Sequence, residues 1–258
     1  MRVSSRLLVL GSCGAWPEAG RACSGYVLEH SGFRVVIDLG YGTGTRLLSL
    51  LGSSAADGID AVIVSHKHPD HMLDLHGLFR ARWFGRPSAA AIPLYAPAGV
   101  IERLKGLEED DASAVDHVFD WRPLPAEAYE LGPFRLESRS LPHWVPNAGV
   151  RLTADGLTVA YTGDTGPDIG LAELGRNADL YIVEASDTYQ QEPSKPIGPQ
   201  MHLTARQAGE ASAEAGSHRL LLTHFWPDND RELSRTSARE VYRGEVLVAS
   251  EGLEIVLA

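Results

Sequence analysis

The segment HKHPDH at residues 66–71 constrains the chain more than any other. It is separated by a single serine, Ser65, from the apolar run AVIV, which is typical of a short buried β-strand. A strand that breaks into a tight loop would direct His66 and His68 to one side of a cavity, while Asp70 and His71 open the next helix and face a second position nearby. Imidazoles with a carboxylate suit Zn²⁺ or a similar borderline divalent cation. The segment therefore predicts a metal site; a solvated histidine-rich loop is the alternative.

Short strand-like runs alternate with helical patterns along the chain. The expected strands are 7–10, 25–28, 34–37, 61–64, 92–95, 134–138, 150–152, 157–161, 180–183, 220–223, 246–248 and 253–256. The expected helices are 43–51, 70–83, 97–106, 171–176, 204–215 and 231–242. Gly32 and Gly156 mark hairpin turns between adjacent strands. Hairpins combined with interleaved helices predict an α/β fold in which two mixed β-sheets pack together and are flanked by helices. We expect residues 1–258 to form a single domain.

Charge and cysteine content restrict the partners and the compartment. A formal net charge of -11 disfavours binding to structured nucleic acid or to an anionic membrane, because either partner would be repelled. No run reaches the roughly 18 apolar residues of a membrane span. Cys13 and Cys23 are too few for a disulfide framework, so we expect free buried thiols. The apolar stretch after Arg6 is too short for a signal peptide, and a cytoplasmic location is expected.

Three further candidate ligands follow expected strands. His143 comes after the strand that begins at residue 134, Asp164 lies in the segment YTGDTG at 161–166, and His224 ends the run LLLT. Strand ends hold side chains rigidly while leaving space for a substrate. Each residue alone is compatible with a capping or loop role, but the set in this order indicates one site.

With these residues, the chain resembles the metallo-β-lactamase superfamily of hydrolases over most of its length. The resemblance implies an αβ/βα four-layer sandwich and a dinuclear metal site. One ion would be held by His66, His68 and His143, the other by Asp70, His71 and His224, and Asp164 would bridge both. It implies two divalent ions; the ligand set favours Zn²⁺, with Mn²⁺ or Fe²⁺ as alternatives. The superfamily includes lactonases, thioesterases, β-lactamases and phosphodiesterases, so the fold alone does not define a substrate.

Two residues outside the metal set resemble the tRNA 3′-processing endonuclease branch. In that branch a Glu and a His assist protonation of the leaving group, and Glu184 and His202 stand at matching positions. A departing alkoxide is a poor leaving group, so a positioned acid is valuable, and a carboxylate hydrogen-bonded to imidazole keeps it charged. The alternatives are a helix-entry histidine that contacts backbone and a glutamate that accepts from a strand-end amide.

The chain also departs from that branch. The tRNA processors insert a long basic arm between the positions of His143 and Asp164, and here the interval holds only two short strands. Val183 stands where that branch usually has another histidine. The chain resembles more closely the bacterial cyclic-nucleotide phosphodiesterases of the same fold, which lack the arm. The segments that carry this resemblance are GSxG at 11–14, CSGY at 23–26, DLG at 38–40, DLxGLF at 74–79 and YTGDTG at 161–166.

The resemblance implies a metal-dependent phosphodiesterase that acts on a small, cyclic-nucleotide-like phosphodiester. A hydroxide that bridges two ions about 4 Å apart would attack phosphorus. Asp70 would orient or deprotonate that nucleophile, and His202, steadied by Glu184, would protonate the leaving oxygen. A tRNase Z-like endoribonuclease and a lactonase or thioesterase are the alternative enzymes, and a degenerate scaffold is the non-enzyme alternative. A homodimer is compatible with the resemblance, although no residue indicates one.

Several other residues have open roles. Asp38 is a candidate partner of a ligand histidine, and Trp144, Phe225 and Trp226 either wall the site and stack on a base or pack in the core. His30 and His218 are expected at the surface, and His76 either supports the site or packs in the core. The acidic run 108–111 is expected as a solvated loop, with a lid as the alternative.

Overall fold

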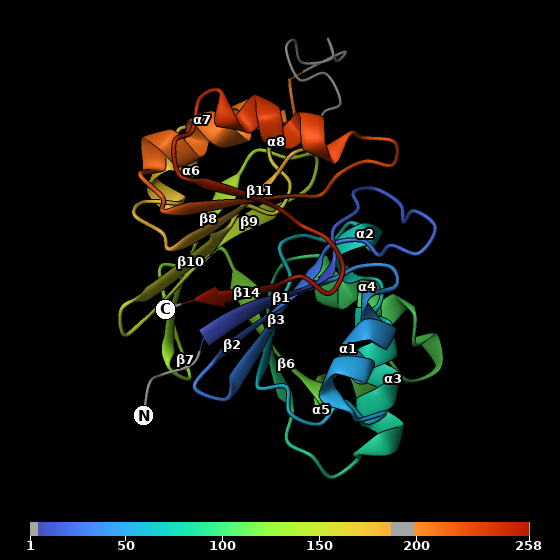
Figure 1. Ribbon diagram of the computed structural model, residues 1–258. Helices are drawn as coiled ribbons and strands as arrows, with labels where there is room; N and C mark the ends of the chain where they lie inside the picture. Colours follow the sequence, from blue (N-terminus) through green and yellow to red (C-terminus); the bar gives the residue numbers. More distant parts are fainter. Residues whose placement is uncertain (1–4, 187–198, 258) are drawn as a thin grey trace.

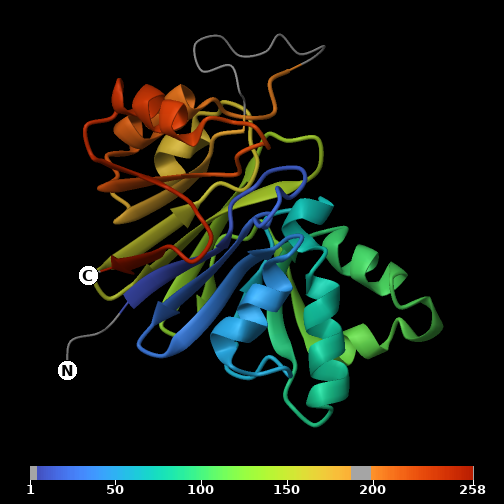
Figure 2. The same ribbon diagram turned by 45° about the vertical axis from the view of Figure 1, so that its right-hand side comes forward.

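Two seven-stranded sheets stack face to face, with helices on both outer sides (Figures 1 and 2). The computed structural model describes residues 5–186 and 199–257. Apolar side chains from the facing sides of both sheets form the central core, with Tyr26, Ile63 and Tyr161 among its fully buried members. The predicted fold class, two mixed sheets flanked by helices in four layers, is confirmed.

The first sheet is formed by the N-terminal half of the chain and the C-terminal strand. Its strands in spatial order are β14 (Glu254–Leu257), β1 (Ser5–Gly11), β2 (Gly25–His30), β3 (Phe33–Leu39), β4 (Ala61–Ile63), β5 (Ile92–Pro97) and β6 (Phe119–Leu124). The pairs from β14 to β3 are antiparallel, and those from β3 to β6 are parallel. The left-handed Ser31 and Gly32 form the predicted hairpin turn between β2 and β3.

The second sheet has the same division between antiparallel and parallel pairing. Its strands in spatial order are β13 (Glu245–Val248), β12 (Arg219–Thr223), β11 (Leu180–Glu184), β10 (Leu157–Tyr161), β9 (Asn147–Ala154), β8 (Phe134–Leu141) and β7 (Tyr129–Leu131). The pairs from β7 to β10 are antiparallel, and those from β10 to β13 are parallel.

Helices cover the outer face of each sheet, as Figure 2 shows. The first sheet is covered by α1 (Thr43–Leu51), α3 (Leu75–Gly85), α4 (Val100–Gly106) and α5 (Ala114–Val118), and the second by α6 (Gly170–Leu174), α7 (Ala205–Ala215) and α8 (Arg231–Arg239). Two short elements complete the fold, α2 (Pro69–Met72) and a 3₁₀ turn, η1 (Glu109–Asp111). Helix α7 begins with a capping box formed by Thr204 and Gln207 and ends at the left-handed Gly216.

Several sequence predictions about elements were wrong. The expected helix 70–83 is two helices, because the backbone N–H of Asp74 leaves the helical pattern and donates to the carbonyl of Leu39 (3.0 Å). Strands β6 and β7 and helix α5 were not predicted; β6 is an edge strand that contains Pro123. The residues 109–111 of the acidic run form η1 and not an open loop.

Two histidines outside the site also lie elsewhere than expected. His30, expected at the surface, is 5% exposed, and its Nδ1 lies 2.8 Å from the Ser5 hydroxyl. His76, expected to support the site or to pack in the core, stacks on the core residue Phe79, but its Nε2 lies 2.6 Å from Glu108, which also pairs with Arg80. Cys13 and Cys23 are free and buried, as predicted.

Candidate metal centre

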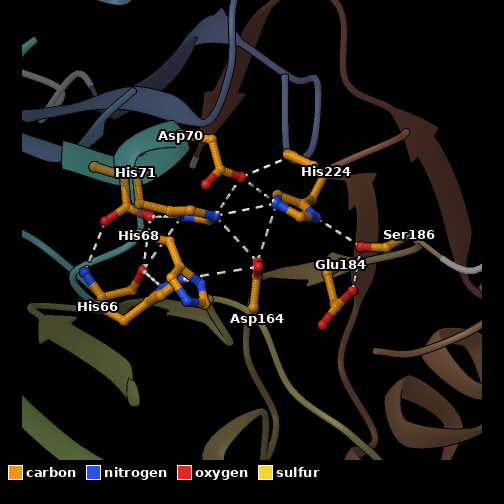
Figure 3. A network of polar contacts seen from close by, with 12 residues as sticks. His66, His68, Asp70, His71, Asp164, Glu184, Ser186 and His224 are labelled. Atoms are coloured by element: carbon orange, nitrogen blue, oxygen red, sulfur yellow. Dashed lines mark hydrogen bonds and ion pairs between the residues drawn. The ribbon is translucent and has the colours of Figure 1, made fainter. Parts of the chain in front are cut away.

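The candidate ligands project from loops and helix starts that follow strands of both sheets. His66 and His68 lie in the loop after β4, and Asp70 and His71 belong to α2, all at the end of the first sheet. His143, Asp164 and His224 follow β8, β10 and β12 of the second sheet. The two sheets are joined here, because the backbone N–H of Ala148 in β9 donates to the carbonyl of Ser65 (2.9 Å). The structure brings all seven side chains together, and Figure 3 shows this for all of them except His143.

The first cluster contains three imidazoles and one carboxylate oxygen. His68 Nδ1 lies 3.0 Å from His66 Nε2 and 3.1 Å from His143 Nε2. Asp164 Oδ2 lies 3.8 Å from both Nε2 atoms. Four potential ligand atoms therefore surround one point, and the group qualifies by geometry and residue type as a metal site.

The second cluster shares Asp164 through its other oxygen. His71 Nε2 and His224 Nε2 are 3.0 Å apart, and each lies 3.2 Å from Asp164 Oδ1. Asp70 Oδ2 lies 3.1 Å from His224 Nε2 and 3.4 Å from His71 Nε2. Asp164 thus stands between the clusters, with one oxygen facing each, as Figure 3 shows for its labelled neighbours.

These residues fit a pair of cations on two grounds. Asp164 Oδ1 is buried and forms no hydrogen bond of good geometry among the described residues, although two imidazole nitrogens lie 3.2 Å away; a cation between these atoms would satisfy the oxygen. In addition, the outer nitrogens of four of the five histidines, His66, His71, His143 and His224, have polar partners. His143 Nδ1 faces the carbonyl of Met201 (3.2 Å), and His224 Nδ1 faces the Ser186 hydroxyl (2.6 Å). A proton on the outer nitrogen leaves a lone pair on the inner one, which is the form that binds metal.

The outer nitrogen of His71 is held by Asp38, the residue proposed from sequence as a partner of a ligand histidine. Asp38 Oδ2 lies 2.8 Å from His71 Nδ1. The carboxylate also accepts from the Ser65 hydroxyl (2.8 Å), the Ser65 backbone N–H (2.7 Å) and the Tyr161 hydroxyl (2.7 Å). Because Asp38 is fully buried with four donors around it, it fixes the orientation and the tautomer of His71.

The electrostatic surroundings differ between the two clusters. Burial lowers the pKa of His66 well below its usual value and that of His68 to about 4, so these imidazoles are neutral at physiological pH. Burial also opposes charge on His71, but Asp164, Asp70 and Asp38 outweigh it and raise the pKa of His71 well above normal. The carboxylates of the second cluster therefore favour positive charge strongly. Without a metal ion, a proton on His71 supplies this charge.

His202 and Glu184 lie beside the second cluster and contact each other. His202 Nδ1 is 2.9 Å from Glu184 Oε2. Burial alone would lower the pKa of His202, but the charge and hydrogen bond of Glu184 raise it to about 9. Glu184 is fully buried and also accepts a hydrogen bond from the backbone N–H of Thr165. It therefore holds His202 and, at the same time, accepts from a backbone amide, which was the alternative role considered from the sequence.

Sequence reasoning missed Ser186, which connects this pair to the metal cluster. Its hydroxyl donates to Glu184 Oε2 and lies against His224 Nδ1 (Figure 3). A continuous hydrogen-bonded chain therefore runs from His202 through Glu184 and Ser186 to His224. A serine two residues after a strand-end glutamate carries no signal of its own, because the contact depends on how β11 and β12 align.

Comparisons with known proteins place the chain in a family. Residues 33–225 match the model of a family described as Beta-lactamase superfamily domain. The chain belongs to the metallo-β-lactamase superfamily. It is 36% identical to Uncharacterized protein Rv1339 of Mycobacterium tuberculosis, over 98% of this chain and 93% of that protein. It is 30% identical to Ribonuclease Z of Kineococcus radiotolerans, over 86% of this chain and 84% of that protein.

A solved structure agrees with this placement. The metallo-β-lactamase fold protein YhfI of Bacillus subtilis superposes with a TM-score of 0.86 and 27% identity, covering 99% of this chain and 100% of that chain. The predicted superfamily and its tRNase Z-like branch are confirmed. The chain is thus a metallo-hydrolase, with His and Asp clusters suited to metal binding. No helix in the part of the chain that the structure describes is both long and apolar enough to cross a membrane.

Proposed function

We propose that this metallo-hydrolase is a phosphodiesterase that cleaves a small, cyclic-nucleotide-like phosphodiester. The observation that supports the proposal is the contact between His202 and Glu184 beside the two clusters of potential metal ligands. The leaving group of a phosphodiester departs as an alkoxide, which needs a proton, whereas the thiolate released from a thioester does not specially require such a pair. The interval between His143 and Asp164 holds only β9 and β10, and the net charge is -11. Both features favour a small substrate over structured RNA.

Each residue of the site has a separate role in the proposed reaction. Bound divalent cations, for which Zn²⁺ is favoured and Mn²⁺ or Fe²⁺ are alternatives, would supply Lewis-acid stabilisation and a water of lowered pKa. His66, His68 and His143 would hold one ion, Asp70, His71 and His224 the other, and Asp164 would contact both. Asp70 would also orient the attacking water and accept its proton. His202 would give a proton to the leaving oxygen from the nitrogen not bound to Glu184.

The substitution His202→Ala tests the acid. We expect the variant to keep both ions, because His202 is not in either ligand set, but to lose roughly a hundredfold or more in kcat. Elemental analysis and turnover of a cyclic nucleotide measure the two effects. His218→Ala is the matched control, since His218 is also paired with a carboxylate, Asp179, but on the surface. Full turnover in metal-loaded His202→Ala would refute the acid assignment.

A ribonuclease is the second candidate, because a relative named Ribonuclease Z covers most of the chain. Purified protein with measured metal content should be given cyclic nucleotides, pre-tRNA, acyl-lactones and thioesters in parallel. The proposal expects the highest kcat/KM on a cyclic nucleotide. Preferred cleavage of pre-tRNA, or of an acyl substrate, would replace it.

A further inference from the structure

We propose that Trp16, Trp144 and Trp226 form a binding subsite for the planar base of the substrate, on the leaving-group side of the metal centre. We call these three residues the tryptophan rim. The inference deepens the proposed function and rests on it. It names what the site recognises beyond the reacting phosphodiester: a nucleobase, held by stacking.

The rim adjoins the proposed acid. Trp144 and Trp226 each stand edge-to-face against His202, with ring centroids 5.1 Å and 5.7 Å away. Trp16 continues the row, with its ring centroid 6.3 Å from that of Trp226. Trp144 also lies against the first metal cluster, with its ring centroid 5.0 Å from that of His143. A group attached to the oxygen that His202 protonates would therefore lie among indole rings.

Two rings of the tryptophan rim are exposed. Trp144 is 63% exposed and Trp16 51% exposed, whereas nine other aromatic side chains among the described residues are buried. Exposed indole faces beside a catalytic centre are available to a ligand, and indoles stack well on flat rings. Phe225, which was considered for the same role from sequence, is fully buried and belongs to the core.

Trp226 contributes a second, independent sign of a ligand. Its indole Nε1 is buried and has no hydrogen-bond partner among the residues that the structure describes. A buried N–H without an acceptor is costly, and nucleobases carry ring nitrogens and carbonyl oxygens that accept. A purely aliphatic occupant would leave this donor unsatisfied.

The loop that carries Trp16 is fixed to the metal centre. The backbone N–H of Ala15 donates to Asp70 Oδ2 (2.7 Å), and Ala15 has a left-handed φ of 60°. A Cβ on Gly14 would lie 2.6 Å from the His224 ring, so only glycine allows this approach. The position of Trp16 is therefore fixed relative to two candidate ligands, Asp70 and His224, as expected of a residue that contacts the same substrate.

The experiment compares substrates with and without a base. The first pair is 3′,5′-cyclic AMP and methyl riboside 3′,5′-cyclic phosphate, which has a methoxy group in place of adenine. Trp144→Leu and Trp16→Leu should each lower kcat/KM for cyclic AMP by roughly five- to a hundredfold, the range that stacking on a base spans. Both should change kcat/KM for the base-free diester less than twofold. Phe84→Leu is the matched control, because Phe84 is 65% exposed on α3, and it should change neither.

A binding measurement separates failure of the rim from failure of the proposed function. Calorimetry of the zinc-loaded protein should give tighter binding of 5′-AMP than of ribose 5-phosphate, and Trp144→Leu should abolish the difference. If that difference is found without diesterase turnover, the proposed function fails and the rim stands. Two results would overturn the tryptophan rim. One is equal binding of 5′-AMP and ribose 5-phosphate by the wild-type protein, and the other is an equal loss of kcat/KM on both cyclic substrates in the Trp variants.

Discussion

At the residue scale, the charge on His202 depends mainly on its neighbour Glu184, with a smaller contribution from Asp164. Burial works against protonation of His202, and Glu184 reverses this to raise its pKa to about 9. A group with a raised pKa is charged below that value, so turnover should fall as pH rises through about 9. In Glu184→Gln the attraction is lost, and this basic limb of log kcat against pH should move to lower pH. Glu173→Gln on the surface is the control; an unmoved limb in Glu184→Gln would contradict the pairing.

Asp38 acts on the centre through His71 and not through a substrate. In Asp38→Asn, one oxygen becomes an NH₂ group, which cannot accept from all of Ser65, Tyr161 and His71. We expect metal affinity at the second cluster to fall by about 10- to 100-fold, the usual effect of losing such a partner. Competition with a chromophoric chelator measures it. Asp38→Asn that binds both ions as tightly as wild type would show that His71 needs no such support.

At the element scale, the end of strand β3 is pressed against helix α2. A Cβ on Gly40 would lie 1.8 Å from the backbone oxygen of Asp70, a contact that no side-chain movement relieves. Gly40→Ala should therefore displace α2 and destabilise the fold, by about 2 kcal/mol or more, together with loss of metal. Gly77→Ala in α3 is the matched control. Nothing lies within 4 Å of its Cβ, and alanine should stabilise that helix by up to about 1 kcal/mol. Urea unfolding of both variants measures the two changes.

The same element scale explains what the sequence could and could not predict. The ligand candidates were recognisable because each follows an apolar run, and strand ends of stacked sheets meet at one edge. Ser186 and Trp16 could not be recognised from the sequence, because their contacts depend on which loops the order of strands in the sheets brings side by side. Strand β6 was hidden by Pro123 and by the charged residues Asp120 and Arg122, all tolerable at a sheet edge. The helix 70–83 was broken by a tertiary hydrogen bond to Leu39 that periodicity cannot reveal.

At the scale of the whole molecule, the candidate ligands tie one sheet to the other. His66, His68, Asp70 and His71 come from the first sheet, and His143, Asp164 and His224 from the second. A cation that binds only the folded protein stabilises it by mass action, by about 3–4 kcal/mol at 100 to 1,000 times its dissociation constant. Removal of metal by a chelator should therefore lower Tm by roughly 5–15 °C, and added Zn²⁺ should restore it.

The decrease in Tm that follows removal of metal should become larger as pH rises. Without a cation, a proton on His71 offsets the buried carboxylates, because its pKa in the folded protein is raised above the usual value. That stabilisation is complete below the unfolded pKa of about 6.5 and is lost as pH rises towards the folded value. His66 and His68, whose pKa values are lowered, are neutral in both states above about 6.5 and do not counteract it. Metal binding strengthens over the same window, because protons no longer compete. Thermal unfolding with and without chelator, from about pH 6.5 to 8.5, should show a widening gap, with His66→Ala as the metal-deficient control. A constant gap would mean that proton and cation do not occupy the same cluster.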